Sequence, residues 1–437
     1  MTWKRPAAAL VVCVVCMALS AQPPEAGLLF RGLFVLAALG GVWACWRLAH
    51  ADGVELWHVL GLAILCRVVM FPMLPTLSDD GYRYIWDGVL LAHGLSPYAY
   101  VPADPALAGH QLEPIYAALN SPTYFSVYPP VSQAVFALGG LVFSFGWPVS
   151  WYAIKLGFVG LEGIGIACLA RVVSVRGVAL YALHPIALVE IAGQGHTEGA
   201  LVGMLGLALW GISRWPGWAG FALALAGWVK LFPLALAPLL GRRRRGWIGW
   251  LTGCGLGALV LIPGNGFAHV LESVRLYGGT LDFYSAPFLA LKAVLYPVVG
   301  ETAGPWAARL LSLVWGSVLL GVLLTRNGTT ESFRSGLALG VVSYALLSPM
   351  QHPWNWIGVL FVIPLLQYQL PLFWISSISL VTYLRYVGLE WMYLVALLLG
   401  WGGALALAIR EFRKEPPYRV STASTSSADA VSASSHT

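Results

Sequence analysis

Long apolar runs alternate with short polar stretches along almost the whole chain. After a first short run near the N-terminus, the runs occupy residues 28–49, 54–74, 130–147, 150–170, 177–193, 197–213, 217–240, 246–263, 284–299, 304–325, 333–350, 353–369, 371–388 and 390–410. Most approach the roughly 20 residues that a helix needs to cross a bilayer. Several are short or broken by proline, so the pattern predicts a bundle of about 11–14 transmembrane helices with some re-entrant pieces.

Composition also indicates a membrane protein. Of the 437 residues, 58% are hydrophobic and only 10% are charged, whereas soluble domains carry roughly 25% charged residues. The predicted fold class is therefore an all-α polytopic membrane protein. The net charge of +6 is typical of cytoplasmic anchors on membrane helices and gives no reason to expect a nucleic-acid partner. The six cysteines lie in apolar runs, without the spacing of a disulfide framework or a zinc site.

The chain divides into four predicted parts, one of which contains a long polar loop. They are two N-terminal membrane segments (1–53), a membrane core (54–370) with the loop at 75–129, C-terminal membrane helices (371–414) and a disordered polar tail (415–437). The first apolar run predicts an uncleaved helix, and a cleavable signal peptide is the alternative. Short amphipathic helices are expected within the loop.

Positive residues predict how the chain is oriented, because they gather on the cytoplasmic side of membrane helices. Lys4 and Arg5 precede the first helix, and four consecutive arginines at 242–245 form the strongest cytoplasmic marker. A cytoplasmic N-terminus followed by three crossings places loop 75–129 outside the cell (inner) membrane. That loop carries five acids but one Lys or Arg, Arg83, which agrees with an extracytoplasmic location.

Two arginines conflict with this simple alternation. If residues 130–147 and 150–170 both crossed fully, Arg171 and Arg176 would lie outside. We therefore expect one of the two segments to cross only partly. This topology also places the polar stretch 193–199 outside, near the loop.

The loop begins with an acidic motif, SDDGYRYIWDG, at residues 78–88. In a helix, Asp80, Arg83 and Asp87 would share one face, which is also the pattern of a salt-bridged surface helix. The functional alternative is a general base at the membrane surface, Asp80 or the adjacent Asp79, oriented by Arg83. In that interpretation Arg83 and Asp87 are candidates for substrate binding. Charges close to hydrocarbon are costly, which favours the functional interpretation.

Other polar residues interrupt the apolar runs downstream. In YPPVSQ, Tyr128 and Gln133 could hydrogen-bond a polar ligand, although the motif is also ordinary loop scaffolding. In GQGHTEG, Gln194, His196 and Glu198 could bind a phosphate or a sugar hydroxyl, and the alternative is a polar turn between helices.

Three more candidates and one buried pair complete the pattern. Lys230 lies in the middle of an apolar segment and could contact a lipid phosphate or extend to the interface. His352 and Trp354, beside two prolines, predict a membrane break that lines a polar cavity, or else an interfacial aromatic belt. Lys155 and Glu162 are expected to make polar contacts inside the bundle.

Taken in order, these motifs resemble the GT-C superfamily of integral-membrane glycosyltransferases. The resemblance is closest to bacterial polyprenyl-phosphate-mannose-dependent mannosyltransferases and extends to the glycosylphosphatidylinositol mannosyltransferase I family. Its elements are SDDGYRYIWDG (78–88), GLSPY (94–98), YPPVSQ (128–133), HPIALVEIAGQGHTEG (184–199), VKLFPLALAPLL (229–240) and SPMQHPWNW (348–356). They cover the chain from about residue 54 to 370, which would form a GT-C-like catalytic core.

The resemblance implies a catalytic aspartate. Asp80, followed by Arg83 and Tyr84, is similar to that aspartate, while Asp79 aligns better with the first aspartate of other relatives, so both remain open. The chain departs from the family by its two extra N-terminal segments. It also departs by Glu198, where many relatives have Asp or Asn.

The expected function is transfer of a hexose, with mannose as the first candidate, from a polyprenyl-phosphate sugar to a lipid-linked or glycan acceptor. The reaction would invert the anomeric carbon on the extracytoplasmic face, in contact with membrane lipid. Candidates for stabilising the leaving phosphate are Arg83, His196, Lys230 and His352. No cofactor or metal is required by this chemistry, although the paired acids would allow a metal.

Two other classes of function remain as alternatives. A transporter or flippase for lipid-linked sugars would use Lys155, Glu162 and Lys230 to line a pathway. Internal inverted repeats would support a transporter, and none is evident in the sequence. A non-catalytic assembly partner would not depend on the loop acids.

Overall fold

The computed structural model describes residues 2–110, 112–325 and 328–414. Within these ranges the protein is helical, and β-structure is limited to two isolated bridges. The predicted all-α fold class is confirmed at this level. The tail 415–437, which we expect to be disordered, lies outside the described residues.

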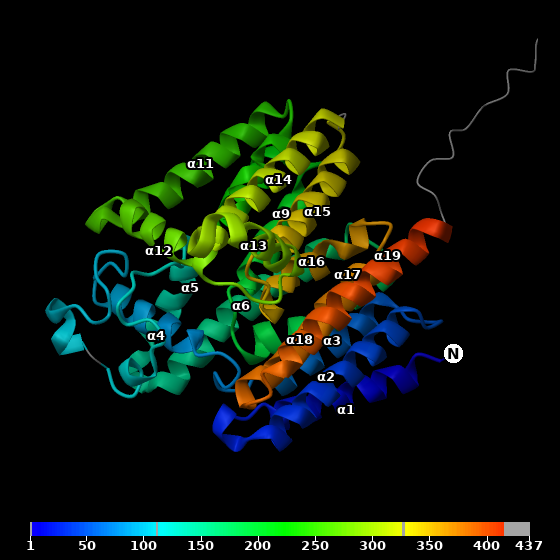
Figure 1. Ribbon diagram of the computed structural model, residues 1–437, viewed down its shortest axis with the longest axis horizontal. Helices are drawn as coiled ribbons and strands as arrows, with labels where there is room; N and C mark the ends of the chain where they lie inside the picture. The colour runs from blue at the N-terminus through cyan, green and yellow to red at the C-terminus, as the bar shows by residue number, and fades with distance from the viewer. Residues whose placement is uncertain (1, 111, 326–327, 415–437) are drawn as a thin grey trace, which may run out of the picture.

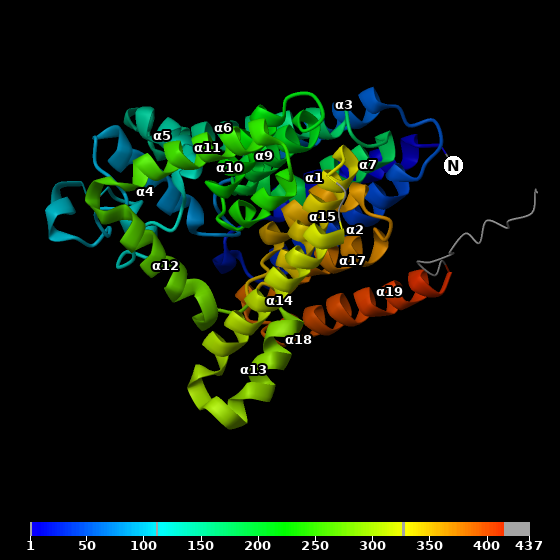
Figure 2. The same cartoon turned by 90° about the horizontal axis from the view of Figure 1, so that it is seen from above.

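The helices form one elongated bundle (Figure 1). In chain order the α-helices of the described ranges are α1 (Lys4–Ser20), α2 (Leu28–Ala49), α3 (Leu56–Met70), α4 (Asp80–Ala92), α5 (Pro130–Leu141), α6 (Trp147–Leu169), α7 (Val175–Ala182), α8 (Pro185–Ala187), α9 (Glu198–Gly211), α10 (Pro216–Gly227), α11 (Arg244–Leu261), α12 (Gly266–Thr280), α13 (Ala286–Val299), α14 (Ala303–Thr325), α15 (Thr330–Leu347), α16 (Ile357–Val362), α17 (Leu370–Ile378), α18 (Trp391–Leu397) and α19 (Gly403–Lys414). Helices α1 to α3 lie on one side of the bundle, and α11 lies on the other. Figure 2 shows that α13 projects from the body.

Several stretches are long and apolar enough to cross a membrane. In the described part of the chain there are five: Leu28–Ala49, Trp147–Leu169, Ala286–Thr325, Leu370–Val387 and Trp391–Lys414. The number rises to seven if two bent helix pairs each form one span. Four shorter apolar helices of 10–17 residues add to these. The structure therefore gives a multi-pass membrane protein with five to seven candidate spans, fewer than the 11–14 that the sequence predicts.

Helix α11 separates the arginine cluster from the acidic loop. Its 18 residues correspond to about 27 Å, close to the roughly 30 Å of a bilayer core. The arginines 242–245 lie at its start. Beyond its far end, His269 of α12 hydrogen-bonds the carbonyl of Tyr98 at 2.6 Å and stacks on Phe125 at 3.7 Å. The loop and the arginine cluster therefore lie at opposite ends of α11, and their location on opposite sides of the membrane stays a prediction.

The loop folds around α4, which packs closely against α5. A Cβ atom on Gly88 would lie 2.1 Å from the carbonyl oxygen of Phe136, so the crossing requires glycine. Tyr84 stacks on the Phe136 ring at 4.5 Å. Helix α5 has 12 residues, about 18 Å, which is too short for a full crossing. Its length favours the expectation that one of the two segments after the loop crosses only partly.

Broken helices meet the loop at the centre of the bundle. Helices α7 and Pro185–Gly193 are bent by 52° relative to each other. Residues Leu188–Gly193 form a π-helical turn, a rare distortion that is frequent at functional sites. The chain then turns through 194–197 into α9. The polar side chains at these breaks, those of Glu190, Gln194, His196 and Glu198, are buried inside the bundle.

The two charged residues of α6, Lys155 and Glu162, make polar contacts inside the bundle, as the sequence predicts. Glu162 forms a salt bridge with Arg67 at 2.6 Å and accepts a hydrogen bond from Tyr181 at 3.0 Å. Lys155 donates to the carbonyls of Phe71 and Met73 at 2.6 and 2.8 Å. Both side chains therefore stabilise the contact between α6 and the α3 region.

Candidate active site

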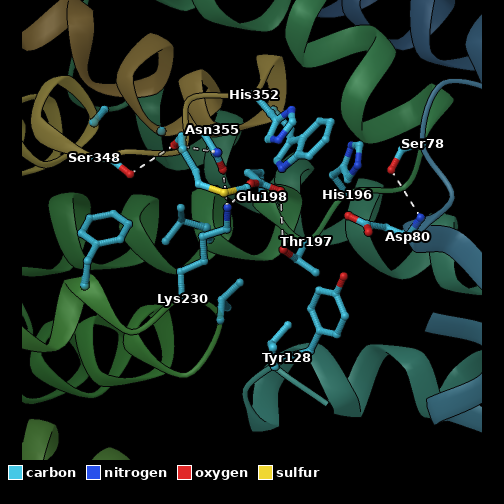
Figure 3. A pocket seen from close by; sticks show the side chains of 18 of the residues that line it. Ser78, Asp80, Tyr128, His196, Thr197, Glu198, Lys230, Ser348, His352 and Asn355 are labelled. Atoms are coloured by element: carbon cyan, nitrogen blue, oxygen red, sulfur yellow. Dashed lines mark hydrogen bonds and ion pairs between the residues drawn. The ribbon is translucent and has the colours of Figure 1, made fainter. Parts of the chain in front are cut away.

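A cavity of about 1410 Å³ opens between the loop, the broken helices and α14 and α15. Figure 3 shows the polar end of a pocket, with Asp80 and His196 adjacent and Lys230 close to Glu198. The predicted site residues that line the cavity are Asp79, Asp80, Tyr128, His196, Glu198, Lys230, His352 and Trp354. Those that do not line it are Arg83, Asp87, Gln133 and Gln194. Tertiary packing thus brings most of the predicted residues to one site.

The two loop acids lie where α4 begins. Asp80 is its first residue and is half-buried, whereas Asp79 is exposed. The side-chain amide of Asn120 donates to Asp79 at 2.8 Å and to Asp80 at 3.3 Å. Burial raises the pKa of the Asp80 carboxyl, and the nearby His196 opposes that rise. A carboxylate with a raised pKa is better matched to proton transfer near neutral pH.

His196 is held from behind by a carboxylate on the π-helical turn. Its Nδ1 lies 3.0 Å from Glu190 Oε2, and Glu190 Oε1 accepts a hydrogen bond from the Tyr383 hydroxyl at 2.7 Å. Both His196 and Glu190 are at most 1% exposed. Burial alone would lower the pKa of His196, but the contact with Glu190 outweighs it and the pKa is raised. The ring is therefore a buried imidazolium over a wider pH range than an ordinary histidine.

Aromatic rings form a stacked column behind His196. His196 stacks on Trp354 at 4.4 Å, Trp354 on His352 at 4.4 Å, and His352 on Phe283 at 3.9 Å. Burial, followed by the positive charge of His196, lowers the pKa of His352 to about 3. His352 is uncharged at neutral pH, so it cannot supply the positive charge that we expect from it at a leaving phosphate.

Lys230 is engaged by polar partners inside the cavity. Its Nζ pairs with Glu198 and donates to Asn355 Oδ1 at 2.9 Å. The Lys230 side chain is 28% exposed and that of Glu198 2% exposed. The short segment between α10 and the 3₁₀ stretch Phe232–Leu240 carries the lysine. The ion pair accounts for a charged residue in the middle of an apolar segment.

Arg83 and Asp87 form an internal network instead of contacting the cavity. Arg83 Nε donates to Asp87 at 2.8 Å and Nη1 donates to the carbonyl of Tyr124 at 3.0 Å. Asp87 also accepts from Ser126 at 2.5 Å and from Gln133 at 2.8 Å. These contacts hold α4 against the end of the loop. Arg83, Asp87 and Gln133 thus contact one another and the loop and do not line the cavity, and a role in substrate binding stays a prediction for them.

Gln194 also serves the loop. Its side-chain oxygen accepts from the backbone N–H groups of Thr76 and Leu77 at 3.1 and 2.9 Å, and its nitrogen donates to Leu74 at 3.1 Å. The contacts fix the chain immediately before Asp79. Gln194 thus positions the acidic motif from the other side of the cavity and does not line it.

One wall of the same cavity is apolar. Helices α14 and α15 contribute Leu311, Trp315, Leu319, Val341, Ala345 and Leu347 to it. Phe232 and Ala235 extend this wall beside Lys230. A molecule that fills the cavity would therefore place a polar group near the acids and an apolar chain along α14 and α15.

The sequence reasoning missed four polar residues at or behind the site. They are Arg31, Asn120, Asn355 and Tyr383, which contact or adjoin the residues described above. Asn355 lies next to Trp354 in the SPMQHPWNW motif, so its neighbours were a usable signal. Arg31 is a charged residue inside the apolar run 28–49 and Asn120 lies in the polar loop, so both carried a local signal, whereas Tyr383 carried none.

The described ranges contain no group of three or more His, Cys, Asp and Glu residues placed to hold a metal ion. Comparisons of the chain with protein-family models, with curated proteins and with solved structures found no match.

Proposed function

We propose that the protein is a membrane glycosyltransferase of GT-C type that uses a polyprenyl-phosphate sugar as donor. One observation carries the proposal: one cavity joins the half-buried Asp80 and the buried His196 to a long apolar wall. A sugar on a lipid phosphate has the same division between a polar head and an apolar chain. The order of sequence motifs adds the superfamily and mannose as the first sugar to test.

In the proposed reaction, Asp80 removes the proton from the acceptor hydroxyl as the oxygen attacks the anomeric carbon. The new C–O bond forms on the face opposite the phosphate, and the bond between that carbon and the phosphate oxygen breaks. Polyprenyl phosphate leaves with the electron pair, and the anomeric configuration is inverted. Asp80 is preferred to Asp79 because it is more buried, adjoins His196 and has a raised pKa.

His196 and Asn120 would prepare Asp80 for this role. The imidazolium of His196 favours the ionised carboxylate, which is the form that accepts a proton. Asn120 donates to both acids and restricts their orientation. Glu190 and Tyr383 lie behind His196, so they act through it and not on the substrate.

The contacts of α6 give less support to a transporter or flippase. Such a protein would need Lys155 and Glu162 to face a pathway. Neither residue lines the cavity, and both are occupied by the contacts with Arg67 and backbone carbonyls described above. Their partners suit a fixed structural role.

A transfer assay with the purified protein in detergent tests the proposal. Labelled polyprenyl-phosphate mannose and envelope lipid extract are the substrates, because detergent removes the two compartments that a flippase needs. Asp80→Asn is expected to reduce transfer by roughly 10²–10⁴-fold, and Asp79→Asn by less. Asp104→Asn, which keeps a hydrogen-bonding side chain at Ala106 N, is the matched control. Full transfer by both Asp79→Asn and Asp80→Asn would rule out the assigned base.

A further inference from the structure

The cavity contains few positive groups that are available to an anion. Its basic side chains are Arg31, His196, Lys230 and His352. Lys230 is paired with Glu198, and His196 is paired with Glu190. His352 is uncharged, because its pKa is lowered to about 3. A phosphate that enters the polar end would therefore meet cations that already contact a carboxylate, with the exception of Arg31.

Arg31 lies in the first turns of α2 and is 2% exposed. Its Nη2 donates to the carbonyls of Gln22 and Thr76 at 3.2 and 3.4 Å. Its Nη1 has no hydrogen-bond partner among the residues that the structure describes. Within the same ranges no carboxylate lies within salt-bridge distance of it, although Glu25, which also lines the cavity, interacts with it at longer range. The guanidinium thus lines the cavity with one donor nitrogen unused.

A purely structural role explains only part of this geometry. The contacts of Nη2 join the α1–α2 connection to Thr76, just before the acidic motif. That join needs one donor group, which a neutral side chain such as Gln could also supply. A buried guanidinium with no carboxylate in direct contact is costly, and such charges in membrane proteins are usually functional. The unused Nη1 indicates a ligand that carries negative charge.

The surroundings of Arg31 connect it to the acids. Its Cζ lies 6.0 Å from the centre of the Tyr383 ring, and the Tyr383 hydroxyl bonds to Glu190 behind His196. Tyr386 lies with Tyr383 on the 3₁₀ stretch Ser379–Val387, and it lines the cavity together with Arg31 and Asp80. A phosphate at Arg31 would therefore lie at the same polar end as the proposed base. Because little water reaches Nη1, the ion pair formed there would be weakly screened.

We propose that Arg31 binds a phosphate ester of a lipid substrate, so that α2 is part of the substrate site. The ester could be the phosphate of an isoprenoid or that of a glycerolipid, which share this chemistry. The identity of the substrate rests on the proposed function, whereas the anion site itself does not. The N-terminal membrane segments, which the sequence places outside the catalytic core 54–370, then contribute directly to binding.

Binding to the purified full-length protein tests this site without any transfer reaction. One arm measures the affinity for farnesyl phosphate, with farnesol as its uncharged analogue. The other compares phosphatidylglycerol with phosphatidylcholine in mixed micelles. Arg31→Gln is expected to weaken binding of a phosphate ester by at least about tenfold, and Arg31→Lys by less. Arg47→Gln removes a cation from the other end of the same helix and is expected to change neither affinity.

The two arms also identify the source of the phosphate. Loss confined to farnesyl phosphate assigns Arg31 to an isoprenoid phosphate, and loss confined to phosphatidylglycerol assigns it to a glycerolipid. If Arg31→Gln lowers the melting temperature of the free protein but leaves both affinities unchanged, Arg31 is only structural and the proposal is wrong. Arg31-dependent binding by a protein without transfer activity would instead overturn the proposed function and keep the anion site.

Discussion

At the scale of single residues, the site consists of charges that modify one another. Asp80 is buried enough to hold its proton more tightly than an ordinary aspartate, and His196 works against that effect. The pKa of His196 is itself raised, because Glu190 contacts the ring. The ionisation of the proposed base, Asp80, therefore depends on the charge of His196, and that charge depends in turn on Glu190.

This chain of contacts predicts a pH dependence. Transfer needs the ionised Asp80, so kcat/KM should fall as the pH drops through the raised pKa of Asp80. His196→Gln removes the positive charge that favours ionised Asp80, and the acid limb should move to higher pH. Glu190→Gln should shift the limb in the same direction, since it weakens the charge on His196. A pH profile of kcat/KM for the three proteins measures the effect.

A merely structural role of His196 would give a different result. Activity would then decrease at every pH by a similar factor, and the position of the acid limb would not change. Asp104→Asn again serves as the control, because Asp104 belongs to the same loop but does not line the cavity.

At the scale of the helices, breaks and glycines position the site. The π-helical turn Leu188–Gly193 directs Glu190 toward His196. The α4–α5 crossing, where Gly88 and Gly140 meet, fixes the helix that carries Asp80. Small residues at such crossings allow close helix contact in membrane proteins.

The glycine crossing can be tested with a pair of alanine variants. In Gly88→Ala the new methyl group would lie 2.1 Å from a backbone oxygen of α5, so α4 and α5 must separate. We expect a loss of about 1–3 kcal/mol in unfolding free energy together with reduced transfer. Gly160→Ala in α6 meets open space and should be neutral or stabilising by up to about 1 kcal/mol. Thermal unfolding in detergent measures both effects. Equal unfolding temperatures for the two variants would show that the α4–α5 crossing does not require glycine at position 88.

At the scale of the whole molecule, two features connect the fold to a membrane reaction. The loop and the arginine cluster lie at opposite ends of α11 (Figure 1). The cavity extends from the loop acids to the apolar wall of α14 and α15. Together they are consistent with the proposed site, which would take a lipid-linked substrate from the membrane on the side opposite the arginines.

Cysteine labelling tests that orientation. In a cysteine-free background, Ala106→Cys lies in the loop and Arg244→Cys at the start of α11, and both positions are exposed. A membrane-impermeant maleimide should label only Ala106→Cys in intact cells and both variants after permeabilisation. Labelling of Arg244→Cys in intact cells would reverse the predicted topology.

A second test at this scale fills the apolar part of the cavity. Gly316 of α14 lines it, and no atom lies within 4 Å of a Cβ at that position. Gly316→Trp should therefore occupy the space for a lipid chain and lower kcat/KM for a long-chain donor by about tenfold or more. Gly321→Trp, on the same helix, also meets open space but lies outside the cavity lining. Equal activity of both variants would show that the donor does not use this wall.

The sequence by itself determined the membrane class, the all-helical fold and the polar motifs that meet in the cavity. These features can be read from neighbouring residues. The length of an apolar run indicates whether a helix can cross the membrane, and a charged residue inside such a run has an energetic cost that favours a functional role. It also predicted that Lys155 and Glu162 make polar contacts inside the bundle, which they do with backbone carbonyls and with Arg67 respectively. The spans of Leu28–Ala49 and Trp147–Leu169 correspond closely to runs read from the sequence.

Only the tertiary structure decided which polar residues face the cavity. Arg83, Asp87, Gln133 and Gln194 found partners within the loop and behind it, whereas Arg31, Asn120 and Asn355 joined the site. A motif gives the type of a side chain and its neighbours in sequence. The hydrogen-bond partner of that side chain depends on which helices pack together, and this packing is determined by residues far apart in the chain. For each buried charge the sequence therefore allows several chemically possible partners, and only the tertiary packing determines which of them it contacts.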